Sequence, residues 1–168
     1  IVGTKTAGRQ KAFASNFMPL LGENTEFGMK WATLYDSQLD EGIRDPIKVY
    51  EFMNKFYVEE GNKRVSVMKA VDAAYIPANV IRILPKRTEE KDNLIYYEFV
   101  DFYSVAQTNE IWFSQVGSFP ALIQAIGKKP GEPWDIEFRR NFFSLYNTFS
   151  EYFLAKGGEK LSVTTADA

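Results

Sequence analysis

The 168-residue sequence contains no cysteine and no histidine. It therefore has no disulfide, no thiolate nucleophile, no Cys/His zinc site and no imidazole that could act as a general base. Any chemistry must come from carboxylates, Lys, Arg, Ser, Thr or Tyr, or from a hard metal ion bound by carboxylate oxygens. The lack of cysteine leaves the redox compartment open.

The sequence also lacks a long apolar run and a strong charge of either sign. No apolar stretch approaches the roughly 20 residues that span a bilayer, and no signal-like hydrophobic region is present. We therefore expect a cytoplasmic protein with no membrane contact. The formal net charge is -2, which gives no general attraction to nucleic acid. Because the sequence begins at Ile1 rather than Met, we interpret it as a mature or excised part of a longer parent.

Aromatic residues are abundant, with 14 Phe, 9 Tyr and 3 Trp. Many of them recur at helical spacing in the C-terminal half. One apolar stripe steps by four and three residues along a predicted helix and is expected to face a core: Phe138, Phe142, Leu145, Phe149 and Tyr152. The less favoured alternative is a platform on which nucleic-acid bases stack.

The predicted elements indicate an α+β fold, in which a small sheet with helices is followed by an all-helical region. We expect an N-terminal arm, an α/β domain, a helical domain and a flexible tail at 1–26, 27–88, 89–157 and 158–168. The α/β domain is expected to contain a helix, a hairpin, a second helix and a third strand, at 24–41, 45–52 with 55–60, 64–74 and 76–84. The helical domain is expected to contain helices at 94–106, 109–114, 118–127 and 135–158.

The motif EEGNKR at 59–64 lies between a predicted strand and a predicted helix. The first turn of a helix has unpaired N–H groups and a partial positive charge, and Gly61 allows a ligand to approach the backbone closely. Lys63 and Arg64 add full positive charges, so the segment has the features of an anion site. Charged turns are also common on solvated surfaces, and the motif alone leaves both interpretations open.

The surrounding sequence resembles the N-terminal domain of the ParB/sulfiredoxin superfamily over about residues 27–84. In that pattern a helix ends in Gly-aliphatic, a strand begins with Pro-aliphatic-x-Val, a Gly-x-x-Arg box opens a helix, and an Ile-Pro pair opens the last strand. The matching residues are, in order, Gly42-Ile43, Pro46-Ile47 with Val49, Gly61 with Arg64, and Ile76-Pro77-Ala78. The order and spacing of these blocks make the resemblance more specific than any single block.

The resemblance implies a phosphate pocket at the Gly-x-x-Arg box. ParB proteins bind the triphosphate of CTP there, and sulfiredoxins bind ATP beside a catalytic cysteine. By position, a nucleotide would contact Gly61, Asn62, Lys63 and Arg64, and Arg44 is a further candidate. Asn62 stands where ParB usually has Glu and sulfiredoxin has Cys, which excludes sulfiredoxin chemistry and weakens the expectation of CTP hydrolysis.

Glu59 and Glu60 are the candidate catalytic residues, because a carboxylate there could act as a base. Glu60 is also the candidate ligand of a Mg²⁺ ion. The alternative interpretation of both residues is a solvated strand end. The expected function is a ParB-like domain that binds a phosphate-bearing ligand, such as CTP or ATP with Mg²⁺, in a DNA-associated or regulatory protein.

Two other functions stay open. One is a Mg²⁺-dependent enzyme of the same superfamily, such as a nuclease, an NTPase or a small-molecule kinase. The other is a DNA-binding or protein-interaction module without catalysis. Residues 118–143 faintly resemble a helix-turn-helix, but the connection from Gly127 to Asp135 is longer than the usual turn of three or four residues. The sequence leaves self-association open.

Overall fold

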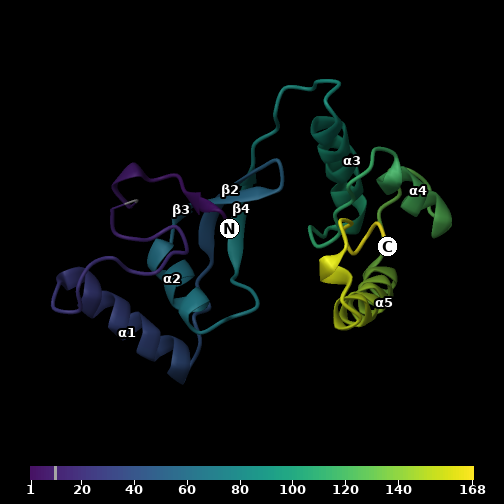
Figure 1. Cartoon of the computed structure of the whole chain (residues 1–168). Coiled ribbons are helices and arrows are strands. Elements are labelled where there is room, and N and C mark those ends of the chain that lie inside the picture. Colours follow the sequence, from purple (N-terminus) through teal and green to yellow (C-terminus); the bar gives the residue numbers. More distant parts are fainter. Residues whose placement is uncertain (10) are drawn as a thin grey trace. The chain divides into compact units, whose positions relative to one another are not determined.

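The computed structural model describes residues 1–9 and 11–168, and these form two compact units, Ile1–Pro85 and Lys86–Ala168 (Figure 1). The first unit contains a mixed four-stranded sheet with helices, and the second is helical. The predicted α+β fold class is therefore confirmed. No helix in the described part of the chain is both long enough and apolar enough to cross a membrane.

The sheet of the first unit has the strand order β1-β3-β2-β4. Its strands are β1 (Gly3–Thr4), β2 (Ile47–Phe52), β3 (Lys55–Glu60) and β4 (Ala78–Arg82). β2 and β3 form the predicted antiparallel hairpin. β4 joins the same sheet, as predicted, and runs parallel to β2. Met53 and Asn54 connect the hairpin with φ angles of 50° and 59°, the positive values that a two-residue turn between twisted strands requires.

Two helices accompany the sheet, α1 (Glu26–Asp40) and α2 (Asn62–Ala70). The Thr25 hydroxyl caps α1 by accepting a hydrogen bond of 3.0 Å from the Gly28 N–H. The Trp31 indole N–H donates to the buried hydroxyl of Ser66 at 2.8 Å, which joins α1 to α2. α2 begins at residue 62, two residues earlier than predicted.

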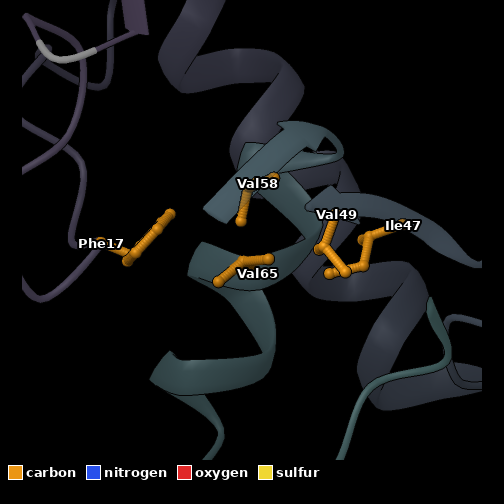
Figure 2. Close-up of a cluster of buried hydrophobic side chains, with 5 residues drawn as sticks. All are labelled: Phe17, Ile47, Val49, Val58 and Val65. Atoms are coloured by element: carbon orange, nitrogen blue, oxygen red, sulfur yellow. The ribbon is translucent and has the colours of Figure 1, made fainter. Parts of the chain in front are cut away.

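The core of this unit lies between α2 and one face of the sheet. Figure 2 shows five buried side chains that converge from β2, β3, α2 and the N-terminal segment: Phe17, Ile47, Val49, Val58 and Val65. The period of two along β2 and β3 places the valines of both strands on the same face, opposite each other in the register. This packing fixes where β3 ends and where α2 begins.

The N-terminal segment contributes a short strand to the sheet and two rings to the core. Residues 3 and 4 form β1 and pair parallel to β3, and Phe13 and Phe17 are buried. Leu20 is exposed. Parallel pairing joins residues more than 50 positions apart, so a local sequence pattern does not reveal it.

The second unit contains α3 (Lys91–Ala106), α4 (Ser118–Ala125) and α5 (Ile136–Ala155). The helix predicted at 109–114 is wrong, because this segment is irregular in the structure. Ile111 and Phe113 are buried, and the Trp112 ring lies 5.2 Å from the Phe99 ring. Three consecutive apolar residues that all pack inward do not suit a helix, in which neighbours point about 100° apart.

The predicted core face of α5 is only partly correct. Phe138 and Phe142 pack against the buried Trp134, with ring centroids 5.0 Å from its ring in both cases. Farther along the helix, the remaining members of the stripe are exposed: Leu145 to 71%, Phe149 to 43% and Tyr152 to 68%. Periodicity identified the apolar face of α5, but the Trp134 side of the core covers only its first two turns.

The C-terminal segment contains a short 3-10 helix, Gly158–Lys160, and then contacts the loop before α4. The Asp167 carboxylate accepts hydrogen bonds from the Ser114 N–H at 3.0 Å and from the Thr164 hydroxyl at 2.9 Å. Burial raises the pKa of Asp167, but these hydrogen bonds outweigh that effect, and the net shift is downward. The carboxylate is therefore ionised at neutral pH and holds the end of the chain.

Asp135 gives the α5 cap a defined pH dependence. Its carboxylate accepts a hydrogen bond of 2.8 Å from the Phe138 N–H, and this bond is the main reason why the pKa of Asp135 lies below its usual value. A lowered folded-state pKa stabilises the fold above the unfolded pKa of about 3.9, and the contribution disappears as the pH falls through the folded value. Asp135→Asn keeps a capping oxygen that does not titrate. We expect its melting temperature to fall less than that of the parent when the pH is lowered from 7 to 3. Melting curves of both proteins at the two pH values test this, and equal losses would contradict it.

Candidate functional site

The junction between β3 and α2 has the backbone geometry expected for an anion site. Gly61 separates the two elements with a φ of +97°, in the left-handed region that favours glycine. None of the described side chains caps the start of α2, so the first N–H groups of the helix have no side-chain partner there and can receive a ligand. The helix dipole adds partial positive charge at the same end.

A cavity of about 370 Å³ lies at this junction. All six residues of the 59–64 motif line it. Thr6 and Phe13 complete the wall. Sequence reasoning missed these two, because β1 pairing and the packing of Phe13 on Phe27 bring the N-terminal segment to the cavity from a distant part of the chain.

Asn62 is the most informative residue of the cavity. Its side chain is only 6% exposed, and its buried Oδ1 atom has no hydrogen-bond partner among residues 1–9 and 11–168. An unsatisfied buried acceptor costs about 1–3 kcal/mol, so native folds keep few of them. A half-turn of the amide would present its NH₂ group instead, so Asn62 can meet either a donor or an acceptor of a ligand.

Arg64 and Lys63 both line the cavity but also have contacts within the fold. The Arg64 Nη1 donates to the backbone carbonyls of Asp45 and Pro46, at 2.9 Å each, and Nη2 lies 3.7 Å from the Glu60 carboxylate. The Lys63 ammonium lies 4.5 Å from the centroid of the Phe27 ring on α1. Arg64 therefore supports the chain before β2 in addition to any role at the cavity.

Glu59 belongs to a charged network on β2 and β3. One of its oxygens accepts a hydrogen bond from the Tyr50 hydroxyl, and the other lies 2.9 Å from the Lys48 ammonium. These two contacts, that with Lys48 first, lower the pKa of Glu59, and the same contact raises the pKa of Lys48. Glu59 is thus a carboxylate at neutral pH, which fits a metal ligand; its lowered pKa makes it a weaker base than an ordinary glutamate and does not fit a general acid.

Glu60 and Arg44 complete the set of predicted site residues. Glu60 lines the cavity with an exposed carboxylate, next to Arg64. Arg44 lines a different cavity of the same unit, together with Gly42 and Tyr75, and is not among the residues that line the cavity at the 59–64 motif. Within residues 1–9 and 11–168, no three acidic side chains form a metal-binding group. Mg²⁺ often takes only one or two carboxylates and completes its shell with phosphates, so the Glu60 metal site stays a prediction.

Comparison with protein-family models, with curated proteins and with solved structures finds no match for this chain. The site is therefore defined by its own geometry: a helix start, a cavity beside it, two cationic side chains and a buried amide oxygen, with neither a side-chain cap nor a partner for that oxygen in the described part of the chain.

Proposed function

We propose that this chain carries a ParB-like domain that binds the phosphate groups of a nucleotide at the start of α2. The observation that carries the proposal is the cavity at the start of α2, where the described residues supply no side-chain cap and Asn62, Lys63 and Arg64 line the wall. The open N–H groups at 62–64 would receive phosphate oxygens, and Lys63 and Arg64 would balance their charge. From the resemblance, CTP or ATP with Mg²⁺ is the expected ligand.

The size and chemistry of the cavity support a nucleotide. Its volume of about 370 Å³ falls within the range of small-molecule sites, about 300–1,000 Å³. The carboxylates of Glu59 and Glu60 would repel a bare polyphosphate, so a divalent cation between the phosphates and Glu60 suits the site better than an anion alone. Turnover of the bound nucleotide would favour the enzyme alternative, in which Glu60→Gln abolishes the reaction.

Thermal shift and titration calorimetry with ATP, CTP, GTP and inorganic phosphate, each with and without Mg²⁺, test the proposal. We expect at least one nucleotide to bind and to raise the melting temperature. At a ligand concentration of 100 times Kd, the stabilisation would be about 2.7 kcal/mol. A chain that binds none of these ligands, with or without Mg²⁺, would refute the proposal and favour the protein-interaction alternative.

Asn62→Leu separates a binding role of this residue from a structural one. Leucine is similar in size to asparagine and removes the buried acceptor that lacks a partner. We therefore expect the free protein to be as stable as the parent or about 1 kcal/mol more stable. The affinity for the nucleotide should fall about tenfold, because one hydrogen bond to a phosphate-bearing ligand is lost. Calorimetry and melting curves measure the two effects.

Asn147→Leu is the matched control, since Asn147 is an exposed residue of α5 in the other unit. It makes the same chemical change and the same gain in helix propensity, away from the cavity. We expect this variant to bind the nucleotide like the parent. If Asn62→Leu destabilises the free protein and leaves its affinity unchanged, Asn62 has a structural role only.

A further inference from the structure

Residues 2–6 run along the edge of β3 and end beside the cavity; we call them the N-terminal strap. The Val2 N–H donates to the Phe56 carbonyl at 2.9 Å, and the Lys5 N–H donates to the Val58 carbonyl at 2.8 Å. The Thr4 hydroxyl also donates to the Val58 carbonyl. The strap is thus held mainly by hydrogen bonds to a single strand.

Thr6 is the point at which the strap meets the candidate site. Its hydroxyl donates to the carbonyl of Glu59 at 3.2 Å, and its side chain lines the cavity together with residues 59–64. A hydroxyl that donates its hydrogen to Glu59 still has lone pairs that can accept a hydrogen bond from a ligand. Beyond residues 7–12 the chain returns to the same cavity with Phe13, which is buried on Phe17 and Phe27.

The strap is weakly attached to the sheet because it forms few contacts. β1 has only two residues and lies at the edge of the sheet, and Ile1 and Val2 are exposed, so little apolar surface is buried there. The Lys5 ammonium lies 3.7 Å from the centroid of the Tyr50 ring and 3.9 Å from Glu59, and such exposed contacts add little stability. Segments of this kind open locally at a small fraction of the global unfolding free energy.

We propose that the N-terminal strap is part of the ligand site, that Thr6 contacts the bound nucleotide, and that ligand binding and strap closure stabilise each other. This inference rests on the proposed nucleotide binding at α2. A ligand that touches both the α2 start and Thr6 binds the attached state better than the detached one and therefore shifts the equilibrium towards attachment. By linkage, the factor by which the bound ligand favours attachment of the strap is also the factor by which detachment lowers the affinity for the ligand.

Hydrogen exchange of the intact chain tests the linkage directly. The N–H groups of Val2 and Lys5 report attachment, because both are bonded to β3 only while the strap is closed. We expect saturating nucleotide to slow their exchange about tenfold. The amide of Gln107, which donates to Tyr103 at the end of α3 in the other unit, should exchange at its original rate and serves as the internal control.

Two variants test the same linkage through affinity. Lys5→Pro removes the N–H that donates to the Val58 carbonyl and should lower the affinity for the nucleotide about tenfold. Lys5→Ala keeps that hydrogen bond and should lower the affinity no more than about twofold. Thr6→Val removes the hydroxyl while keeping the shape of the side chain, and it should lower the affinity for the nucleotide about fivefold. Melting curves verify that each variant remains folded.

The outcomes separate a failure of the strap inference from a failure of the proposed nucleotide binding. If the parent binds a nucleotide but its strap amides exchange at the same rate at saturation, or if Lys5→Pro binds like the parent, the strap inference is overturned and the proposed function stands. If the parent binds no nucleotide, both are overturned. Slower exchange together with weaker binding by Lys5→Pro supports the linkage.

Discussion

Phe119→Ala is expected to destabilise the helical unit by about 3–5 kcal/mol. Phe119 is 1% exposed and lies at the centre of an aromatic cluster. Its ring centroid is 4.9 Å from that of Phe113, 5.1 Å from that of Phe102 and 6.0 Å from that of Phe99. Truncation to alanine would leave a cavity bordered by three rigid rings that converge from α3 and from the loop before α4, and such a site has little freedom to collapse.

Phe149→Ala on α5 provides the matched comparison, since it removes the same side chain from an exposed position. Phe149 is 43% exposed and stacks on Phe153, one helical turn away. We expect it to change the unfolding free energy by less than about 1 kcal/mol. Chemical denaturation of both variants beside the parent measures the difference. Equal destabilisation by the two substitutions would mean that the outer face of α5 is buried by an interaction that the single chain does not contain.

This contrast shows what the periodicity of α5 could and could not predict. The spacing of its apolar residues gave the correct helix and the correct apolar face. Spacing contains no information about which part of that face meets a partner element. Trp134, which covers Phe138 and Phe142, comes from the irregular segment before the helix, and nothing on α5 itself signals where that cover ends.

The hairpin was more predictable because its sequence pattern is local and is present in both strands. Alternation in β2 and β3 sets the buried face, and the two-residue turn at 53–54 sets the register. The segment at 109–114 failed for the opposite reason: its apolar residues are consecutive, so they indicate burial but no period. Burial without a period fits an irregular chain that packs inward equally well.

The residues of the candidate site also fall into those that a local pattern indicates and those that only tertiary contacts bring to the cavity. The residues of the 59–64 motif were predictable, because a strand end, a glycine and two cations in sequence already describe a helix N-terminus. Thr6 and Phe13 were not, since they reach the cavity through contacts between distant parts of the chain. The bonds from Arg64 to the carbonyls of Asp45 and Pro46 also depend on tertiary structure.

Gly61→Ala is expected to damage both the fold and the site, with a loss of about 2–5 kcal/mol of unfolding free energy. A Cβ atom at this position would lie 2.5 Å from Cγ2 of Ile47, a side chain that is fully buried in the core of Figure 2. Overpacking of this kind costs about 1–3 kcal/mol. The φ of +97° adds backbone strain of about 1–2 kcal/mol for a residue with a side chain.

Gly42→Ala isolates the strain from the clash. Gly42 belongs to the same unit and has a φ of +77°, but an added Cβ would meet no atom within 4 Å. We expect Gly42→Ala to cost only the strain, about 1–2 kcal/mol, and to bind nucleotide like the parent. Gly61→Ala should cost more, and at temperatures at which it is still folded its nucleotide affinity should fall about tenfold, because relief of the clash with Ile47 moves the first N–H groups of α2. Denaturation and calorimetry of the two variants decide between these outcomes. Equal stability losses would show that the clash with Ile47 is relieved at no cost in free energy. An unchanged affinity in Gly61→Ala would show that the position of those N–H groups does not control binding.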